Sequence, residues 1–125
     1  MKVTRSALQI GIAAAKVGNT TGNIGYAVER FIAPYHYGIV RELSGHGVGH
    51  EIHEEPYIPN YGKKGSGEKL KVGMVIAIEP MINVGTDEIR LARDKFTYIT
   101  ADGSLSAHFE KTIVITASGP EIITP

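Results

Sequence analysis

The chain has no cysteine and no tryptophan among its 125 residues. Without cysteine there can be no disulfide framework, no thiol nucleophile and no thiolate zinc site, and the composition fits a reducing compartment. No apolar run approaches the length of a membrane-spanning helix, and the first residues carry no apolar signal segment. We therefore expect a cytoplasmic protein with no membrane partner.

The chain also has no excess of positive or negative charge. Lys plus Arg and Asp plus Glu number 13 each, and no basic stripe stands out, so we expect no nucleic-acid partner. A chain of this size buries roughly two thirds of the surface that its unfolded form exposes. We predict a single domain over residues 1–125.

The most informative stretch is rich in glycine and histidine and covers residues 44–62. Three of the five histidines, His46, His50 and His53, fall within eight residues here and are interleaved with glycines. A helix could place them on one face, but the alternating glycines cost too much helix propensity. We expect an extended or looping backbone that approaches a ligand closely and offers imidazoles to a metal or a substrate.

The remaining pattern predicts helices first and strands afterwards. Apolar residues recur at helical spacing over residues 4–17 and 24–33, with capping residues before the second helix and Pro34 as its stop. Strands are expected over residues 37–43, 73–80, 88–92, 96–100 and 105–116, with an exposed loop over residues 63–71. This order predicts an α+β fold.

Two of the predicted strands each carry one carboxylate, Glu79 and Glu110. Because a buried bare charge is costly, each needs a cation or an arginine. Together with His46 they form a one-nitrogen, oxygen-rich ligand set that suits Mn, Fe, Co or Zn. The alternative is an ion pair at a sheet edge, for which the candidate partners are Arg41, Arg90 and Arg93. Spacing alone leaves both interpretations open.

Four blocks form one ordered pattern: GHGVGHEIHEEP at 45–56, NYG at 60–62, GMVIAIEPMI at 73–82 and SLSAHFEKTIVIT at 104–116. In this order and spacing they resemble the carboxyl-terminal half of a type I methionine aminopeptidase, and the match covers nearly the whole chain. The resemblance implies the pita-bread fold, here an antiparallel curved sheet covered by two helices. It also implies a hydrolase that removes the N-terminal methionine from nascent peptides by metal-activated water.

The resemblance assigns roles residue by residue. It implies that His46, Glu79 and Glu110 are metal ligands and that Glu79 also handles a proton. The complete family site holds two divalent ions (Co, Mn, Fe or Zn), and at most one is expected here. His53 corresponds to a histidine that hydrogen-bonds the substrate near the scissile amide.

Two further residues are implied as substrate contacts. Phe96 occupies the position of an aromatic wall of the methionine pocket, and Ile52 stands where an aromatic side chain is common. The peptide partner expected from the resemblance is a nascent-chain N-terminus.

The sequence also departs from the family pattern. Two aspartate ligands, another active-site histidine and most of the methionine pocket belong to an amino-terminal half that this sequence does not contain. Lys111 stands in place of a histidine, His108 in place of a glutamine and His50 in place of an arginine. We therefore expect little activity from this chain alone, and a partner that is either the missing half or a second copy.

Two other functions remain open. A proline-specific (Xaa-Pro) peptidase shares the glycine-histidine and histidine-glutamate-proline blocks, although NYG and EPMI favour the methionine enzymes. A catalytically dead binding module is supported by the missing ligands, while retention of the histidines and glutamates argues against it.

Overall fold

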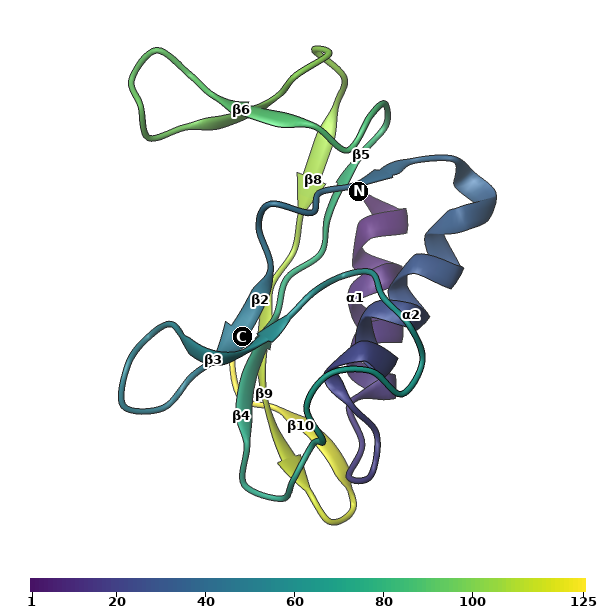
Figure 1. Cartoon of the computed structure of the whole chain (residues 1–125), viewed down its shortest axis with the longest axis vertical. Coiled ribbons are helices and arrows are strands. Elements are labelled where there is room, and N and C mark those ends of the chain that lie inside the picture. The colour runs from purple at the N-terminus through teal and green to yellow at the C-terminus, as the bar shows by residue number, and fades with distance from the viewer.

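Two α-helices form one layer of the fold. The computed structural model describes residues 1–125, and its helices are α1 (Lys2–Ala14) and α2 (Thr21–Ile32), followed by the 3-10 turn η1 (Ala33–Tyr35). Both helices lie along the same face of the strands (Figure 1). The two predicted helices are present, although α1 ends three residues before the predicted boundary. The Asn19 side chain donates to the Ala14 carbonyl at 2.8 Å and so satisfies one of the last carbonyls of α1.

A reciprocal cap fixes the start of α2. The Thr20 hydroxyl accepts a hydrogen bond from the Asn23 backbone N–H at 3.3 Å, and the Asn23 side-chain oxygen accepts one from the Thr20 N–H at 2.9 Å. Two backbone donors that the helix cannot satisfy are thus paired. The capping residues read from the sequence therefore act where predicted.

The larger sheet has five antiparallel strands in the order β10-β9-β4-β2-β3. Its members are β2 (Gly45–Gly47), β3 (Glu54–Ile58), β4 (Val75–Ile78), β9 (Lys111–Thr116) and β10 (Gly119–Ile122). The glycine-histidine stretch is extended, as predicted, and supplies β2 and β3. Pro56 is tolerated in β3 because this strand lies at the sheet edge, where a ladder donor is dispensable.

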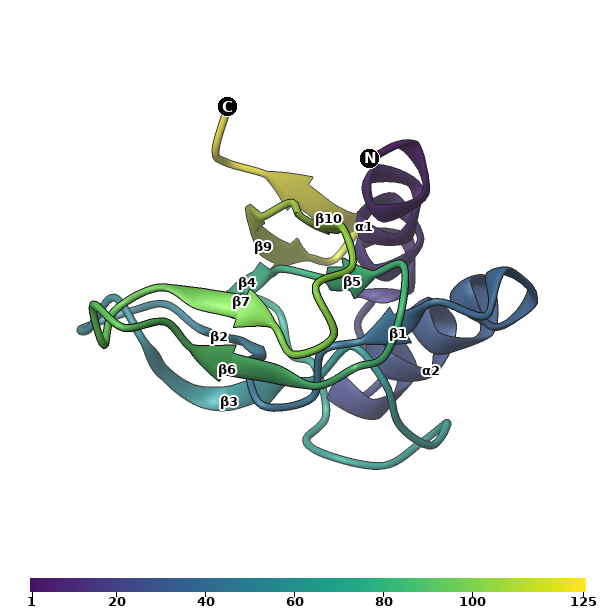
Figure 2. The ribbon, with the colours of Figure 1, turned by 90° about the horizontal axis from the view of Figure 1, so that it is seen from above.

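The other strands form two smaller sheets. One has the order β1-β5-β8 and contains β1 (Gly38–Ile39), β5 (Met81–Asn83) and β8 (Ser106–His108). The other is a hairpin of β6 (Ile89–Leu91) and β7 (Tyr98–Thr100), which lie within two of the predicted strands. Seen from above, the two helices lie on one side and this hairpin projects on the other (Figure 2). The α+β prediction is confirmed.

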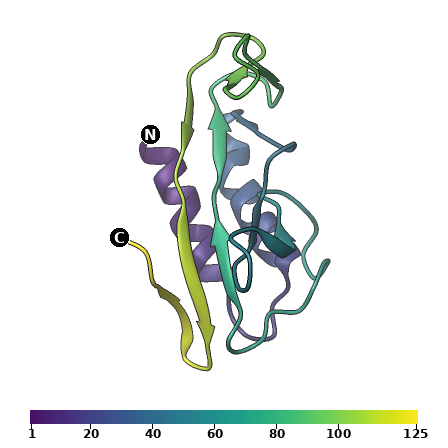
Figure 3. The same cartoon turned by 90° about the vertical axis from the view of Figure 1, so that its left-hand side faces the viewer.

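Two long segments, residues 73–83 and 105–116, each contribute one strand to the five-stranded sheet and one to the three-stranded sheet. The predicted strand over residues 105–116 is interrupted at Phe109 and Glu110, so that β8 pairs with β5 and β9 pairs with β4. The strand predicted over residues 73–80 likewise ends before Pro80 and is followed by β5, which the sequence did not indicate. The two segments run side by side in front of the helices (Figure 3). The interruption places both glutamates between the sheets rather than within a ladder.

The core lies between the helices and the larger sheet. Ile76 and Ile78 of β4 and Ile113 and Ile115 of β9 are fully buried, and they pack with residues of both helices. Because side chains alternate along a strand, Val75 and Ala77 of β4 face the other side of the sheet. No helix has the length and apolar character needed to cross a membrane.

Candidate metal centre

His46 lies at the middle of β2, between two neighbouring strands. Its partners across the sheet are Tyr57 in β3 and Ala77 in β4. The flanking glycines are required by close packing, because a Cβ at Gly45 would clash with the Ala77 carbonyl and one at Gly47 with the Glu55 carbonyl. The Gly-His-Gly pattern thus lets three strands approach closely and buries His46, which is 6% exposed.

Glu79 follows β4 directly and faces two histidines. Its Oε1 lies 3.1 Å from His46 Nε2, and its Oε2 lies 3.2 Å from His108 Nε2. The buried Asn60 side chain donates to the Glu79 backbone carbonyl at 3.3 Å, which holds the main chain at this point. Only 13% of the Glu79 side chain is exposed, so this carboxylate is largely removed from water.

Glu110 completes a cluster drawn from three separate segments. One ligand atom each from His46, Glu79 and Glu110 all lie within 4.8 Å of one another. The three residues that the sequence proposed as ligands are therefore brought together. Arg41, one of the alternative partners, instead forms ion pairs with other carboxylates, those of Glu29 and Asp87, at 3.6 and 3.4 Å. Neither Glu79 nor Glu110 forms an ion pair with an arginine.

The hydrogen bonding of His46 fits a cation. Nδ1 lies 3.0 Å from the Gly47 carbonyl, which only accepts, so Nδ1 carries a proton in this contact. In a neutral ring Nε2 then has the lone pair, yet it faces a Glu79 oxygen that also only accepts. A divalent ion between the two atoms satisfies both.

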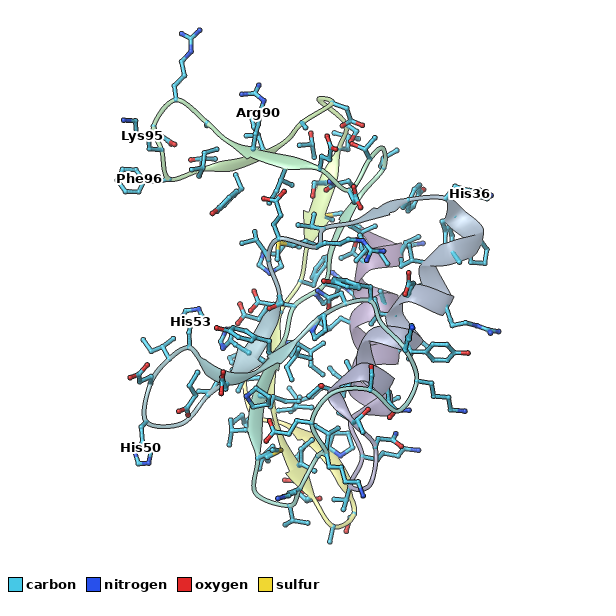
Figure 4. The ribbon with its side chains drawn as sticks, viewed as in Figure 1. His36, His50, His53, Arg90, Lys95 and Phe96 are labelled. Carbon is cyan, nitrogen blue, oxygen red and sulfur yellow. The ribbon has the colours of Figure 1, made fainter.

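A cavity of about 620 Å³ opens beside the cluster. His46, His53, Glu79 and His108 line one part of it, and residues of β5, β6 and β7 line another. The His53 ring packs on the His46 ring, with centroids 4.1 Å apart at 45°. Figure 4 shows His53 at the inner end of its loop and His50 at the far end. Of the two loop histidines, only His53 reaches the cavity.

Two of the predicted substrate contacts lie outside this cavity. Ile52 is 77% exposed and Phe96 is 86% exposed, and neither contributes to the lining. Figure 4 places Phe96 at the outer end of the β6–β7 hairpin. Their contact with substrate stays a prediction.

Other residues, which the sequence did not single out, also line the cavity. The apolar part includes Met81, Ile89, Tyr98 and Ile99. Local patterns could not find them, because the hairpin reaches the site only through the fold. His108 was visible as a departure from the family pattern, two residues before Glu110, but its contact with Glu79 was not. The hydrogen bond to Glu79, together with the nearby negative charges, raises the pKa of His108 against the opposing effect of partial burial.

Residues 1–117 match metallopeptidase family M24. The chain belongs to this family. Among M24 relatives, a methionine aminopeptidase from Clostridium acetobutylicum is 44% identical over 124 residues, which are 99% of this chain and 50% of the relative. The chain thus spans about half the length of the curated relatives that it matches.

Solved structures of similar proteins confirm the fold. The crystal structure of methionine aminopeptidase from Rickettsia prowazekii superposes with a TM-score of 0.95 at 43% identity, covering 99% of this chain and 50% of that one. A prolidase from Pyrococcus furiosus gives a TM-score of 0.73 at 33% identity, covering 99% of this chain and 31% of that one. The pita-bread prediction is confirmed, and the likeness to methionine aminopeptidases exceeds the likeness to the prolidase.

Proposed function

We propose that this chain provides one half of a methionine aminopeptidase site, whose reaction removes the N-terminal methionine from nascent peptides. In this proposal residues 1–125 are one domain that corresponds to the carboxyl-terminal half of the catalytic domain. The observation that carries it is the convergence of His46, Glu79 and Glu110 from three distant segments. The higher structural similarity to a methionine aminopeptidase than to a prolidase supports this substrate class over proline-specific peptides.

The donor set fits one divalent ion, and so does the spacing of His46 and Glu79. Two ligands bound to one metal at about 2.1 Å and about 90° to 110° are about 3.0 to 3.4 Å apart. His46 Nε2 and Glu79 Oε1, 3.1 Å apart, fall within this range. One imidazole and two carboxylates suit Mn, Fe, Co or Zn. When bound, such an ion supplies a Lewis acid that activates water and polarises a peptide carbonyl.

The protein groups around the ion have separate tasks. Glu79 is the largely shielded carboxylate, 13% exposed, that lies between His46 and His108, so we assign it the transfer of a proton between water and the leaving amine. His53 is exposed, packs against His46 with a tilted ring and lines the cavity, so it can donate a hydrogen bond to the substrate near the scissile amide. The cavity, about 620 Å³, accommodates the N-terminal residue of a peptide.

The chain alone should bind one ion weakly and turn over little substrate. Three protein ligands leave the remaining coordination positions to water, and a second ion has only Glu110 to hold it. Hydrolysis of a Met-Ala-Ser peptide by the purified chain, with added Mn or Co, tests this. Turnover comparable to a full-length relative, abolished by Glu110→Ala, would contradict the incomplete site.

A second chain is the partner that we propose for the free sheet edge. β8 pairs with β5 on one side only, so the backbone groups on its other side are open to another strand. Leu105, which directly precedes β8, is an apolar side chain near this edge and is 80% exposed. A symmetric dimer would place two clusters toward a shared cleft. Light scattering that gives 13.5 kDa at every concentration, without hydrophobic-dye binding, argues against the dimer.

The location also remains a proposal. The absence of cysteine fits a reducing compartment, and we therefore propose the cytoplasm.

A further inference from the structure

His108 contacts the Glu79 oxygen that is not in contact with His46. It is the last residue of β8 and lies opposite Met81 across the ladder, which brings its ring beside the end of β4. The His108 Nε2 to Glu79 Oε2 distance is 3.2 Å, and 45% of the His108 side chain is exposed. The two oxygens of Glu79 are thus divided between two imidazoles, His46 on Oε1 and His108 on Oε2.

The contact leaves Oε1 as the Glu79 oxygen beside His46. A carboxylate only accepts hydrogen bonds, so the contact requires a proton on His108 Nε2. The same nitrogen cannot donate a proton and bind a metal, and His108 is not among the residues whose ligand atoms lie within 4.8 Å of one another. The geometry therefore favours a hydrogen-bond donor over a fourth ligand.

We propose that His108 is a positioning residue that holds Glu79 in the orientation required for metal binding, through an Nε2–H donated to Oε2. This inference rests on the proposed function, because it assigns Glu79 Oε1 to the ion. Without the donor, the carboxylate can rotate about its last bonds, and its two oxygens can exchange places. Removing a hydrogen-bonded partner of a metal ligand typically lowers metal affinity about 10-fold to 100-fold.

Substitutions separate the donor role from direct ligation. Glutamine retains an N–H donor of similar reach but is a poor ligand for these metals, whereas alanine removes both functions. His50 provides the control, since it lies at the outer end of the loop and does not line the cavity. The set is therefore wild type, His108→Gln, His108→Ala and His50→Ala, each checked for native circular dichroism.

The assay is titration with Co²⁺, followed by calorimetry and by the visible absorption of the bound ion. We expect His108→Ala to weaken binding at least about 10-fold, while His108→Gln stays within about 3-fold of wild type with the same absorption bands. His50→Ala should bind as wild type. Equal affinity of His108→Ala and wild type would overturn the proposal, and so would a glutamine variant as weak as the alanine variant, because that result indicates a ligand.

A measurement without metal keeps this inference separate from the proposed function. Long-range ¹⁵N–¹H spectra of the metal-free protein should show the His108 proton on Nε2, and Glu79→Ala should return the ring to the tautomer mixture of an exposed histidine such as His50. An unchanged His108 ring in Glu79→Ala would refute the hydrogen bond. If wild type binds no Co²⁺ but the spectra show this bond, the proposed function fails while the contact stands.

Discussion

A single methyl group at Gly45 should disturb both the sheet and the cluster. β2 has strands on both sides, and Gly45 lies opposite Ile58 of β3. A Cβ there would clash with the Ala77 carbonyl of β4 and would lie 3.0 Å from the Ile58 Cβ. Neither neighbour can move aside easily, because both belong to the sheet and Ile58 is fully buried in the core.

The size of the effect follows from the cost of overpacking a rigid interior. Forcing an extra methyl group into such a site costs about 1 to 3 kcal/mol. For a chain of this length, about 4 °C of melting temperature corresponds to each kcal/mol, so Gly45→Ala should lower Tm by about 4 to 12 °C. Because His46 is the next residue, metal affinity should fall as well.

Thermal and urea unfolding with a glycine control test this reasoning. In Gly49→Ala the new Cβ meets only the carboxylate end of Glu54, a flexible side chain that can swing away. The control should therefore unfold close to wild type. If Gly45→Ala is as stable as Gly49→Ala, the claim that close strand packing requires glycine beside His46 is refuted.

Two further predictions concern local hydrogen bonds. Thr20→Ala should destabilise the protein by about 1 kcal/mol in urea unfolding, because the cap with Asn23 is lost, whereas Ser118→Ala at an exposed turn should have no measurable effect. Hydrogen bonds from Thr86 and then from residue 104 lower the pKa of Asp102 from 3.8 to about 2. Because the folded-state pKa of Asp102 lies below its unfolded value, its carboxylate stabilises the fold fully above about pH 4 and loses this effect as the pH falls through about 2. Amide-exchange protection of Thr86 should therefore hold above about pH 4 and disappear near about pH 2. Protection that is already lost at about pH 5 would contradict this.

The helices could be predicted because their signals are local. Apolar spacing marked α1 and α2, and the Thr20 and Asn23 side chains marked the start of the second helix. The strands β6 and β7 were also readable, since two β-prone runs flank a short polar segment. Each of these elements depends on residues near one another in the chain.

One missed strand depends on distant partners. β5 pairs with β1 and β8, neither of which is next to it in the sequence, whereas β10 forms a local hairpin with β9 that was not predicted. The division of residues 105–116 into β8 and β9 arises because the two parts join different sheets, which no alternation pattern reveals.

The candidate site was predictable only in part. Two carboxylates on apolar strands suggested a cation, but arginine partners remained equally consistent until the fold separated Arg41 from Glu79. The apolar cavity wall and the His108 contact required three-dimensional information. The reading of the chain as one domain stays a prediction.

Metal titration of the cluster of His46, Glu79 and Glu110 tests the central claim most directly. Calorimetry with Mn²⁺ or Co²⁺ should show one ion bound weakly per wild-type chain and no specific binding to His46→Ala. His36→Ala is the control, because His36 lies on a turn far from the cluster (Figure 4). Circular dichroism must show that the His46 variant is folded. Absence of binding to the folded wild-type chain, or binding unchanged in folded His46→Ala, would contradict a metal centre at His46, Glu79 and Glu110.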